Sequence, residues 1–188
     1  MIDLPKIILA SASPRRAEIL RTIGWPFDAL AVHIDESRRQ DESAATYVQR
    51  LAREKAETAA ALTVGMNVVG ADTTVVIDDQ ILEKPLDAGD ARRMLEMLSG
   101  RWHKVLTGVA VVDRKSTETR VAYQETEVKF AVMNTDEVDW YVAGGEPMDK
   151  AGGYAIQGQG ARFIEGIRGD FFNVVGLPVR LLYELFTG

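Results

Sequence analysis

The sequence predicts a single domain with an α/β fold, a mixed central sheet flanked by helices, and three observations carry this prediction. Apolar β-branched runs intermix with stretches whose apolar residues recur at helical spacing, without the strict alternation of a parallel sheet. The 188 residues suit one domain of generous size. The chain shows no internal repeat, low-complexity tract or Pro/Ser-rich linker. We therefore expect a single domain over residues 1–188.

The first part of the chain predicts a strand, a helix and a second short strand, followed by a loop. Lys6 to Leu9 is a short apolar run, and Ala17 to Ile23 is typical of a helix. Phe27 to Val32 suits a short strand. Asp35 to Glu42 is polar and charged, which indicates a loop.

The next part predicts a long helix and a hairpin. Apolar residues recur at helical spacing from Ser43 to Leu62, with Ser43 as a candidate cap. Asn67 to Ile77 is an apolar, β-branched run, and Asp78-Asp79 turns it into Gln80 to Leu82.

Beyond the hairpin, further helices and strands surround a glycine-rich loop. The loop is Gly144 to Gly160, which could hold a short strand. Within it, Gly158-Gln159-Gly160 lacks the final glycine and the following helix of a dinucleotide-binding fingerprint. The other expected elements are, in order, a helix over 87–98 closed by Ser99-Gly100, strands over 103–113 and 120–132, a helix over 135–142, a strand over 163–167 and a helix over 178–186.

Composition narrows the function classes. The net charge of −6 argues against a nucleic-acid coat or a membrane-surface protein. Without cysteine, the chain has no disulfide, catalytic thiolate or Cys-based zinc site, and two histidines make a His-rich metal site improbable. No signal peptide or membrane span is evident. We expect a cytoplasmic protein with neither nucleic acid nor membrane as partner.

A candidate phosphate site lies where the first helix begins. Ser13 is a candidate N-cap, and Pro14 suits the first helical position. Arg15 and Arg16 then face the positive end of the helix macrodipole, at a cost of roughly 0.3–1 kcal/mol each when exposed. Free backbone N–H groups, the hydroxyls of Ser11 and Ser13 and two guanidinium groups would suit a bound anion, and a phosphate chain is the natural candidate.

Two acidic residues are candidates for metal binding or general-base catalysis. Asp72 interrupts a β-branched run in which aspartate is disfavoured. It is either bonded to the backbone at a strand kink made by Gly70, or a metal ligand or general base. Glu36 lies in a charged loop, and on charge pattern alone a solvated loop is the better interpretation. Together, Asp72 and Glu36 could hold a magnesium ion, which takes one or two carboxylates plus phosphate oxygens.

Two lysines are weaker candidates. Lys55 lies on the apolar side of its helix, where a lysine usually extends its charge to the rim. A lysine beside a phosphate would give the same pattern. Lys84 follows a predicted strand directly, and Pro85 fixes the backbone there, although Glu83 could simply be its ion-pair partner.

Several ordered motifs resemble the Maf family of nucleoside triphosphate pyrophosphatases. The similarity runs over nearly the whole chain and rests on LASASPRR (9–16), the acidic pair 35–36, LAREKA (51–56), GADT (70–73), EKP (83–85), DKAGGYAIQG (149–158) and VVGLP (174–178). The resemblance implies hydrolysis between the α and β phosphates, with a divalent metal (Mg²⁺, Mn²⁺ or Co²⁺). It also implies an elongated, two-lobed fold like that of Maf and ITPase proteins, with a central cleft, often as a homodimer.

The resemblance also implies roles for individual residues. The aspartate of the GADT motif, Asp72, would be the proton acceptor. The triphosphate binders would be Ser11, Ser13, Arg15 and Arg16, and the charged cleft would be completed by Glu36, Lys55 and Lys84.

The base preference follows from three further positions. Family members that prefer thymidine and uridine triphosphates resemble this chain at Arg15, Thr73 and Gln157. The Gln157 amide offers an acceptor and donors that match the N–H flanked by carbonyls in thymine or uracil. We predict dTTP and UTP as substrates, with modified pyrimidine triphosphates as further candidates.

Two rival functions remain open. A nucleotidyltransferase would need an acceptor before pyrophosphate is released. A nucleotide-sensing regulator of cell division, suggested by the family's link to septum formation, would not depend on Asp72 for its effect.

Overall fold

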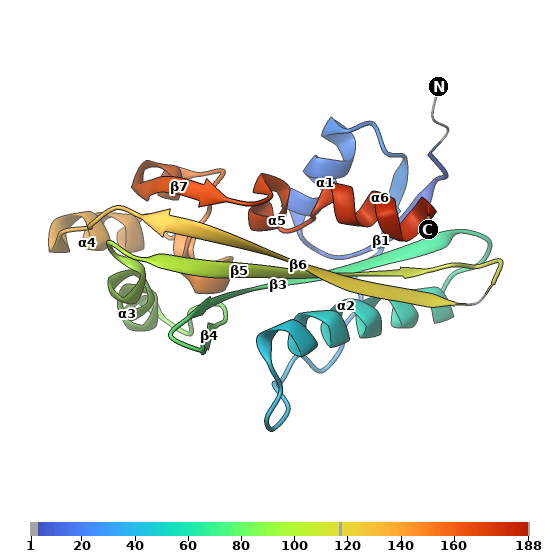
Figure 1. Cartoon of the computed structure of the whole chain (residues 1–188), viewed down its shortest axis with the longest axis horizontal. Helices are drawn as coiled ribbons and strands as arrows, with labels where there is room; N and C mark the ends of the chain where they lie inside the picture. Colours follow the sequence, from blue (N-terminus) through green and yellow to red (C-terminus); the bar gives the residue numbers. More distant parts are fainter. Residues whose placement is uncertain (1–3, 117, 188) are drawn as a thin grey trace. The chain divides into compact units, whose positions relative to one another are not determined.

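The computed structural model describes residues 4–116 and 118–187 and confirms the mixed α/β architecture (Figure 1). The strands are β1 (Ile7–Ala10), β2 (Phe27–Ala29), β3 (Asn67–Ile77), β4 (Gln80–Leu82), β5 (Trp102–Val112), β6 (Thr119–Phe130) and β7 (Ile164–Arg168). The helices are α1 (Pro14–Thr22), α2 (Ala44–Ala61), α3 (Ala88–Leu98), α4 (Thr135–Ala143), α5 (Phe171–Val175) and α6 (Val179–Thr187).

The sheet contains both parallel and antiparallel pairs, as predicted. Its strand order is β2-β1-β3-β5-β6-β7, and β4 pairs with β3. β1 is parallel to both β2 and β3, whereas β4 and β7 are antiparallel to β3 and β6. No helix in the described part of the chain is long and apolar enough to cross a membrane.

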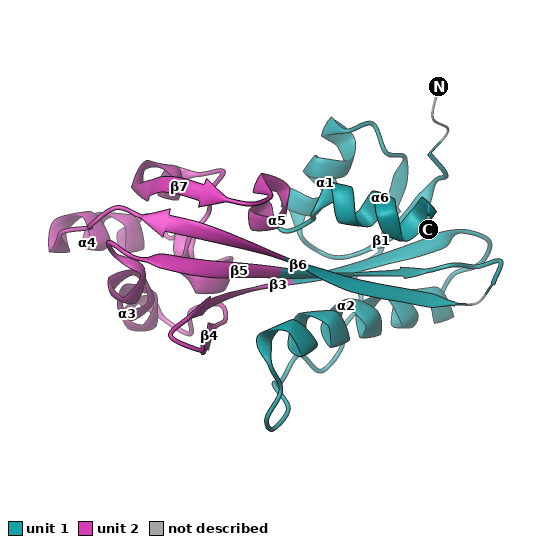
Figure 2. Cartoon of the chain, in the orientation of Figure 1, with its two compact units in different colours: residues 1–72, 107–124, 176–188 teal, residues 73–106, 125–175 magenta. Residues whose placement is uncertain are grey.

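The chain forms two compact units (Figure 2). Unit 1 contains residues 1–72, 107–124 and 176–188, and unit 2 contains residues 73–106 and 125–175. The long strands β3, β5 and β6 each contribute residues to both units. The single domain and the central cleft stay predictions.

In unit 1, α2 packs directly against the backbone of the sheet. A Cβ atom on Gly70 would lie 2.1 Å from the carbonyl oxygen of Ala52, and one on Gly108 would lie 2.2 Å from that of Val48. The helix can approach so closely because Ala52 and Ala56, also on the buried face, are small. Gly70 therefore serves this close approach, and β3 continues through it without the break that a kink would produce.

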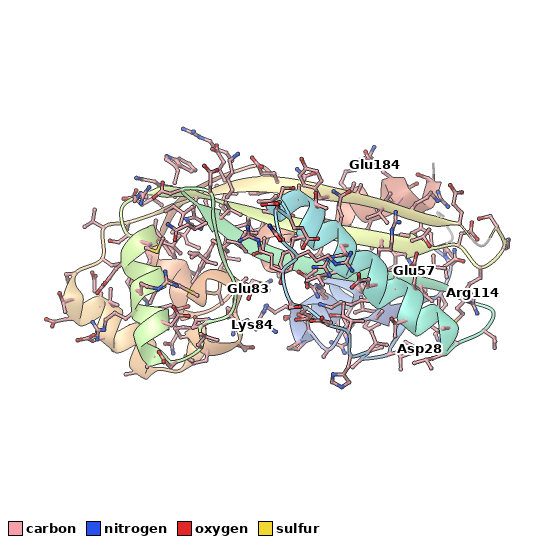
Figure 3. All side chains as sticks on the ribbon, turned by 90° about the horizontal axis from the view of Figure 1, so that it is seen from below. Asp28, Glu57, Glu83, Lys84, Arg114 and Glu184 are labelled. Atoms are coloured by element: carbon pink, nitrogen blue, oxygen red, sulfur yellow. The ribbon has the colours of Figure 1, made fainter. Side chains whose placement is uncertain are left out.

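Side chains and turns fix the ends of α2 and of the β3–β4 hairpin. Ser43 caps α2 by accepting a hydrogen bond from Thr46 N, as predicted. At the other end, the Arg114 guanidinium (Figure 3) donates to the carbonyls of Ala60 and Thr63. The Asp78-Asp79 turn of the hairpin is confirmed, with φ of 48° and 59°.

Unit 2 has its own aromatic core. The rings of Phe130 and Tyr154 lie 4.7 Å apart, and those of Tyr141 and Phe163 lie 5.7 Å apart, both in edge-to-face geometry. His103 is buried beside this cluster, and its Nε2 lies 2.7 Å from the Tyr154 hydroxyl. Burial lowers the pKa of His103 to about 3, so the imidazole is neutral in the folded protein.

In the second half of the chain, one expectation was wrong and one helix was missed. The loop over 144–160 holds no strand and instead forms 3₁₀ turns, η1 (Glu146–Asp149) and η2 (Ala151–Gly153), with η3 (Gln159–Phe163) beginning at its end. Gly145, Gly152 and Gly153 have φ of 75°, 70° and 72°, which turns the backbone away from an extended path. Helix α5 was not predicted because its five residues are too few for a periodic pattern.

Candidate active site

The start of α1 has the predicted layout but a different capping arrangement. Pro14 occupies the first turn, and Ser13 is the N-cap residue with an extended backbone. The Ser13 side chain makes no cap hydrogen bond within the described residues. Instead, the Ser11 hydroxyl oxygen accepts from Ser13 N and from Arg16 Nη1, each at 3.1 Å. Ser11 therefore organises this turn in place of the predicted Ser13 cap.

The two arginines of this turn differ in burial and in role. Arg16 is buried, and its Nε donates to the carbonyl oxygen of Gly176 at 2.8 Å. Burial lowers the pKa of Arg16, while the nearby charges of Asp72 and Glu36 oppose that shift. Arg15 is only partly buried. Arg16 is thus tied to the protein and to the acidic pair, which the sequence did not indicate.

Lys55 joins the two predicted acidic residues. Its Nζ atom lies 2.7 Å from Oε1 of Glu36 and 2.7 Å from Oδ1 of Asp72. The Lys55 and Asp72 side chains are 11% and 13% exposed, whereas that of Glu36 is 50% exposed. The ammonium group of Lys55 therefore stays buried instead of extending to solvent. It forms ion pairs with two carboxylates at once.

The position of Asp72 follows from the packing of α2. Gly70 lets the helix lie against β3, and Lys55 shares the buried helix face with Ala52 and Ala56. Burial raises the pKa of Asp72, although Lys55 and Arg16 oppose the shift. A carboxylate with a raised pKa is a stronger base, as general-base catalysis requires.

The loop that carries Glu36 is attached to α2 rather than simply solvated. The Tyr47 hydroxyl donates to the carbonyl oxygen of Glu36 at 2.9 Å. Arg50 Nη2 donates to the carbonyl oxygen of Ser37 at 3.1 Å. Arg50 also forms a buried ion pair with Glu42, with Nε 2.7 Å from Oε1. These contacts hold the loop backbone where Glu36 can reach Lys55, while residues 35–41 remain exposed to solvent as predicted.

The remaining predicted site residues belong to unit 2. Thr73 directly follows Asp72 in β3 and is half-buried. Lys84 is exposed on the loop after β4 (Figure 3). This loop is braced by η2, because Gly152 N donates to the carbonyl oxygen of Glu83 at 3.0 Å. Gln157 lies in an exposed turn before η3.

The acidic pair, Asp72 and Glu36, suits a divalent cation whose other ligands are phosphate oxygens and water. Among residues 4–116 and 118–187, no three His, Cys, Asp or Glu side chains gather as a metal cluster. Asp72 and Glu36 do converge on one ammonium group, so carboxylate oxygens from two elements reach the same point. Magnesium often uses one or two carboxylates and completes its shell with phosphate oxygens and water. The donor set therefore fits such an ion.

Comparisons with known proteins bear on this site. The chain matches the family model "Maf-like protein" over residues 6–188. It is 50% identical to the "dTTP/UTP pyrophosphatase" of Syntrophus aciditrophicus over 179 residues, which cover 95% of this chain and 87% of that protein. The protein of the same name from Symbiobacterium thermophilum is 47% identical over 98% of this chain and 94% of its own. The one from Vibrio cholerae is 48% identical over 97% of this chain and 96% of its own.

Among solved structures, the chain is similar to the Staphylococcus aureus Ham1 protein. The TM-score is 0.49 and the identity 14%, over 96% of this chain and 97% of that chain.

Proposed function

Because the chain belongs to the Maf-like protein family, we propose that it is a hydrolase that converts dTTP and UTP to the nucleoside monophosphate and pyrophosphate. Relatives that are 47–50% identical over nearly the whole chain carry the name dTTP/UTP pyrophosphatase. The observation that carries the proposal is the convergence of Asp72, Glu36 and Lys55 on one point, with the charge of Arg16 nearby. Such a group can activate water beside a polyphosphate.

The protein must position a water molecule and stabilise the charge on the phosphates. The water oxygen forms a new bond to phosphorus, and the anhydride bond between the α and β phosphates breaks. The electron pair of that bond leaves on the bridging oxygen, which becomes part of pyrophosphate. One proton of the water passes to Asp72. Because no covalent intermediate is required, the rate enhancement comes from positioning the water and stabilising the charge on the phosphates.

Lys55 has a positioning role in this scheme. Its ammonium group binds both Asp72 and Glu36, which fixes their orientation and limits the rise in the pKa of Asp72. Asp72 and Glu36 would also hold a divalent metal, Mg²⁺, Mn²⁺ or Co²⁺. When bound, such an ion neutralises phosphate charge and acidifies water.

The start of α1 supplies the triphosphate contacts. The Ser13 hydroxyl lies at the positive end of the helix, and Ser11 and Arg16 fix the turn. Arg15 and Lys84 would contribute charge to the phosphates. The charge of Arg16 offsets that of the acidic pair, which a highly charged anion would otherwise avoid.

Base recognition is assigned to Arg15, Thr73 and Gln157. The exposed amide of Gln157 can donate to and accept from the N–H and carbonyl groups of thymine or uracil. Modified pyrimidine triphosphates that keep this edge are candidate substrates too. The single domain, the homodimer and the cytoplasmic location stay predictions.

The test is pyrophosphate release from a panel of triphosphates with Mg²⁺, Mn²⁺ or Co²⁺. We expect dTTP and UTP to be hydrolysed without any acceptor substrate. Release only in the presence of an acceptor would indicate a nucleotidyltransferase. Tight triphosphate binding without release under every metal would favour a nucleotide-sensing regulator and contradict the hydrolase.

A further inference from the structure

The turn that carries Gln157 is anchored on both sides by two side chains from neighbouring elements. The Tyr141 hydroxyl oxygen accepts from Ala155 N at 3.1 Å. Glu146 Oε1 accepts from Gln159 N at 2.9 Å, and its Oε2 accepts from Gly160 N at 3.0 Å. Backbone amides before and after Gln157 are therefore held by one phenol and one carboxylate.

The two anchoring side chains are themselves joined. Tyr141 donates its hydroxyl proton to Glu146 Oε2 at 2.6 Å. Tyr141 is fully buried at the end of α4, and its ring packs against Phe163, with centroids 5.7 Å apart. The hydroxyl position is thus set by the core of unit 2, and the carboxylate position is set by the hydroxyl.

Glu146 remains ionised in this arrangement. Burial alone would raise the pKa of Glu146, but hydrogen bonds from Tyr141 and from the amides of Gln159 and Gly160 hold it below its usual value. An ionised acceptor forms the stronger hydrogen bonds to backbone N–H groups. The turn is therefore bound by charge-assisted bonds.

The glycines of the Gly158-Gln159-Gly160 motif explain why the anchor can form. A Cβ atom on Gly158 would lie 2.0 Å from Glu146 Oε1, and one on Gly160 would lie 2.6 Å from the Tyr141 hydroxyl oxygen. The two glycines let the backbone on the C-terminal side of Gln157 lie directly against the two anchoring groups.

Gln157 itself depends on this support. Its side chain is exposed and makes no hydrogen bond with the rest of the described chain. The direction of its amide is therefore set by the backbone of the turn. A paired donor and acceptor must meet the base edge in a fixed geometry, so a small tilt of the turn weakens both bonds together.

We propose that Tyr141 and Glu146 are positioning residues that set the base preference by holding the Gln157 turn in place. The proposal rests on the proposed function and adds two residues that touch neither the phosphates nor the base. Their contribution is expected in the selection among bases and in KM, with little effect on kcat.

The experiment measures pyrophosphate release from UTP and from GTP by the full-length protein. The variants are Tyr141→Phe, which keeps the ring and removes the hydroxyl, and Glu146→Gln. We expect each to lower the kcat/KM ratio of UTP over GTP by about tenfold through KM for UTP, with kcat changed less than about threefold. Tyr123→Phe and Glu165→Gln, at exposed sites, serve as matched controls and keep the wild-type ratio.

A second comparison separates positioning from general loosening. In a Gln157→Ala background, the change Tyr141→Phe should leave the UTP/GTP ratio unchanged, because the side chain that it positions is gone. An unchanged ratio for Tyr141→Phe in the native background overturns the inference, and so does an equal fall in both backgrounds. If Glu146→Gln does not fold, Tyr141→Phe decides the matter alone. Failure of the unmutated protein to hydrolyse UTP overturns the proposed function instead.

Discussion

The ammonium nitrogen of Lys55 lies 2.7 Å from Oδ1 of Asp72, and both side chains are largely buried. This contact joins α2 to β3 at Asp72, where burial raises the pKa of the carboxyl group. The ion pair therefore connects the packing of unit 1 with the protonation state of the proposed base.

Replacing Asp72 with Asn should remove the base while keeping the shape of the site. We expect kcat for UTP to fall by about 10²–10⁴-fold, as for loss of a general base. Triphosphate binding should persist, because the α1 turn is untouched and one negative charge is gone. Pyrophosphate release and titration calorimetry would measure the two effects. A variant that retains more than a third of the activity would show that another group accepts the proton.

Replacing Lys55 with Met should move the pH profile as well as lower activity. The ammonium group of Lys55 lowers the pKa of Asp72 against the effect of burial, so its removal raises that pKa further. Because the active form is the ionised carboxylate, the acid limb of kcat/KM should shift to higher pH. Arg53→Met, an exposed change on the same helix, should leave the limb in place. A shift to lower pH would contradict the assignment of Asp72.

Replacing Gly70 with Ala should strongly destabilise the protein. The added Cβ would lie 2.1 Å from the carbonyl oxygen of Ala52, so α2 must move away from β3. We expect a loss of about 2–3 kcal/mol in the free energy of unfolding, as for overpacked cores. Urea titration would measure it, with Gly89→Ala in α3 as the control, expected to change stability by less than about 1 kcal/mol. Equal stability of the two variants would contradict the close approach.

The buried His103 should make stability depend on pH. Its folded pKa is about 3, below the ordinary 6.5, so the unfolded chain binds a proton that the folded protein does not. The folded protein has the full stability that the neutral, buried imidazole allows above pH 6.5. That stability is lost progressively as the pH falls from 6.5 toward 3. Between pH 7 and pH 5, the loss is about 2 kcal/mol.

The matched variant for this effect is His103→Gln, which keeps a polar group beside Tyr154 and does not titrate. Urea titrations at pH 7 and pH 5 should show a smaller difference for the variant than for the natural sequence. An equal difference in the two proteins would place the pH dependence elsewhere.

Local signals predicted much of the fold. The Asp78-Asp79 turn could be identified because few residue types tolerate left-handed backbone at two successive positions. Ser43 could be identified as a cap because its hydroxyl competes well for the first free amides of a helix. Ser13 has the same chemistry, but its predicted cap is absent because the Ser11 hydroxyl already accepts from Ser13 N and fixes the turn differently.

Contacts between residues far apart in the chain could not be predicted from the sequence. The Glu36 loop has no periodicity, and its attachment to Tyr47 and Arg50 holds its backbone where the carboxylate reaches Lys55. The anchor of the Gln157 turn was missed because Glu146 follows a helix as one polar residue among many. Gly158 and Gly160 were the available signal, but the neighbouring sequence does not indicate which side chains pack against them.

The hydrogen bond from Arg16 Nε to the Gly176 carbonyl spans 160 residues of sequence. During synthesis, α1 leaves the ribosome long before residue 176 is added. Until then, the buried guanidinium lacks one of its acceptors, and the turn that would grip phosphate is incomplete. A nascent chain should thus gain affinity for nucleotides only near the end of translation, when the segment over 174–178 can dock.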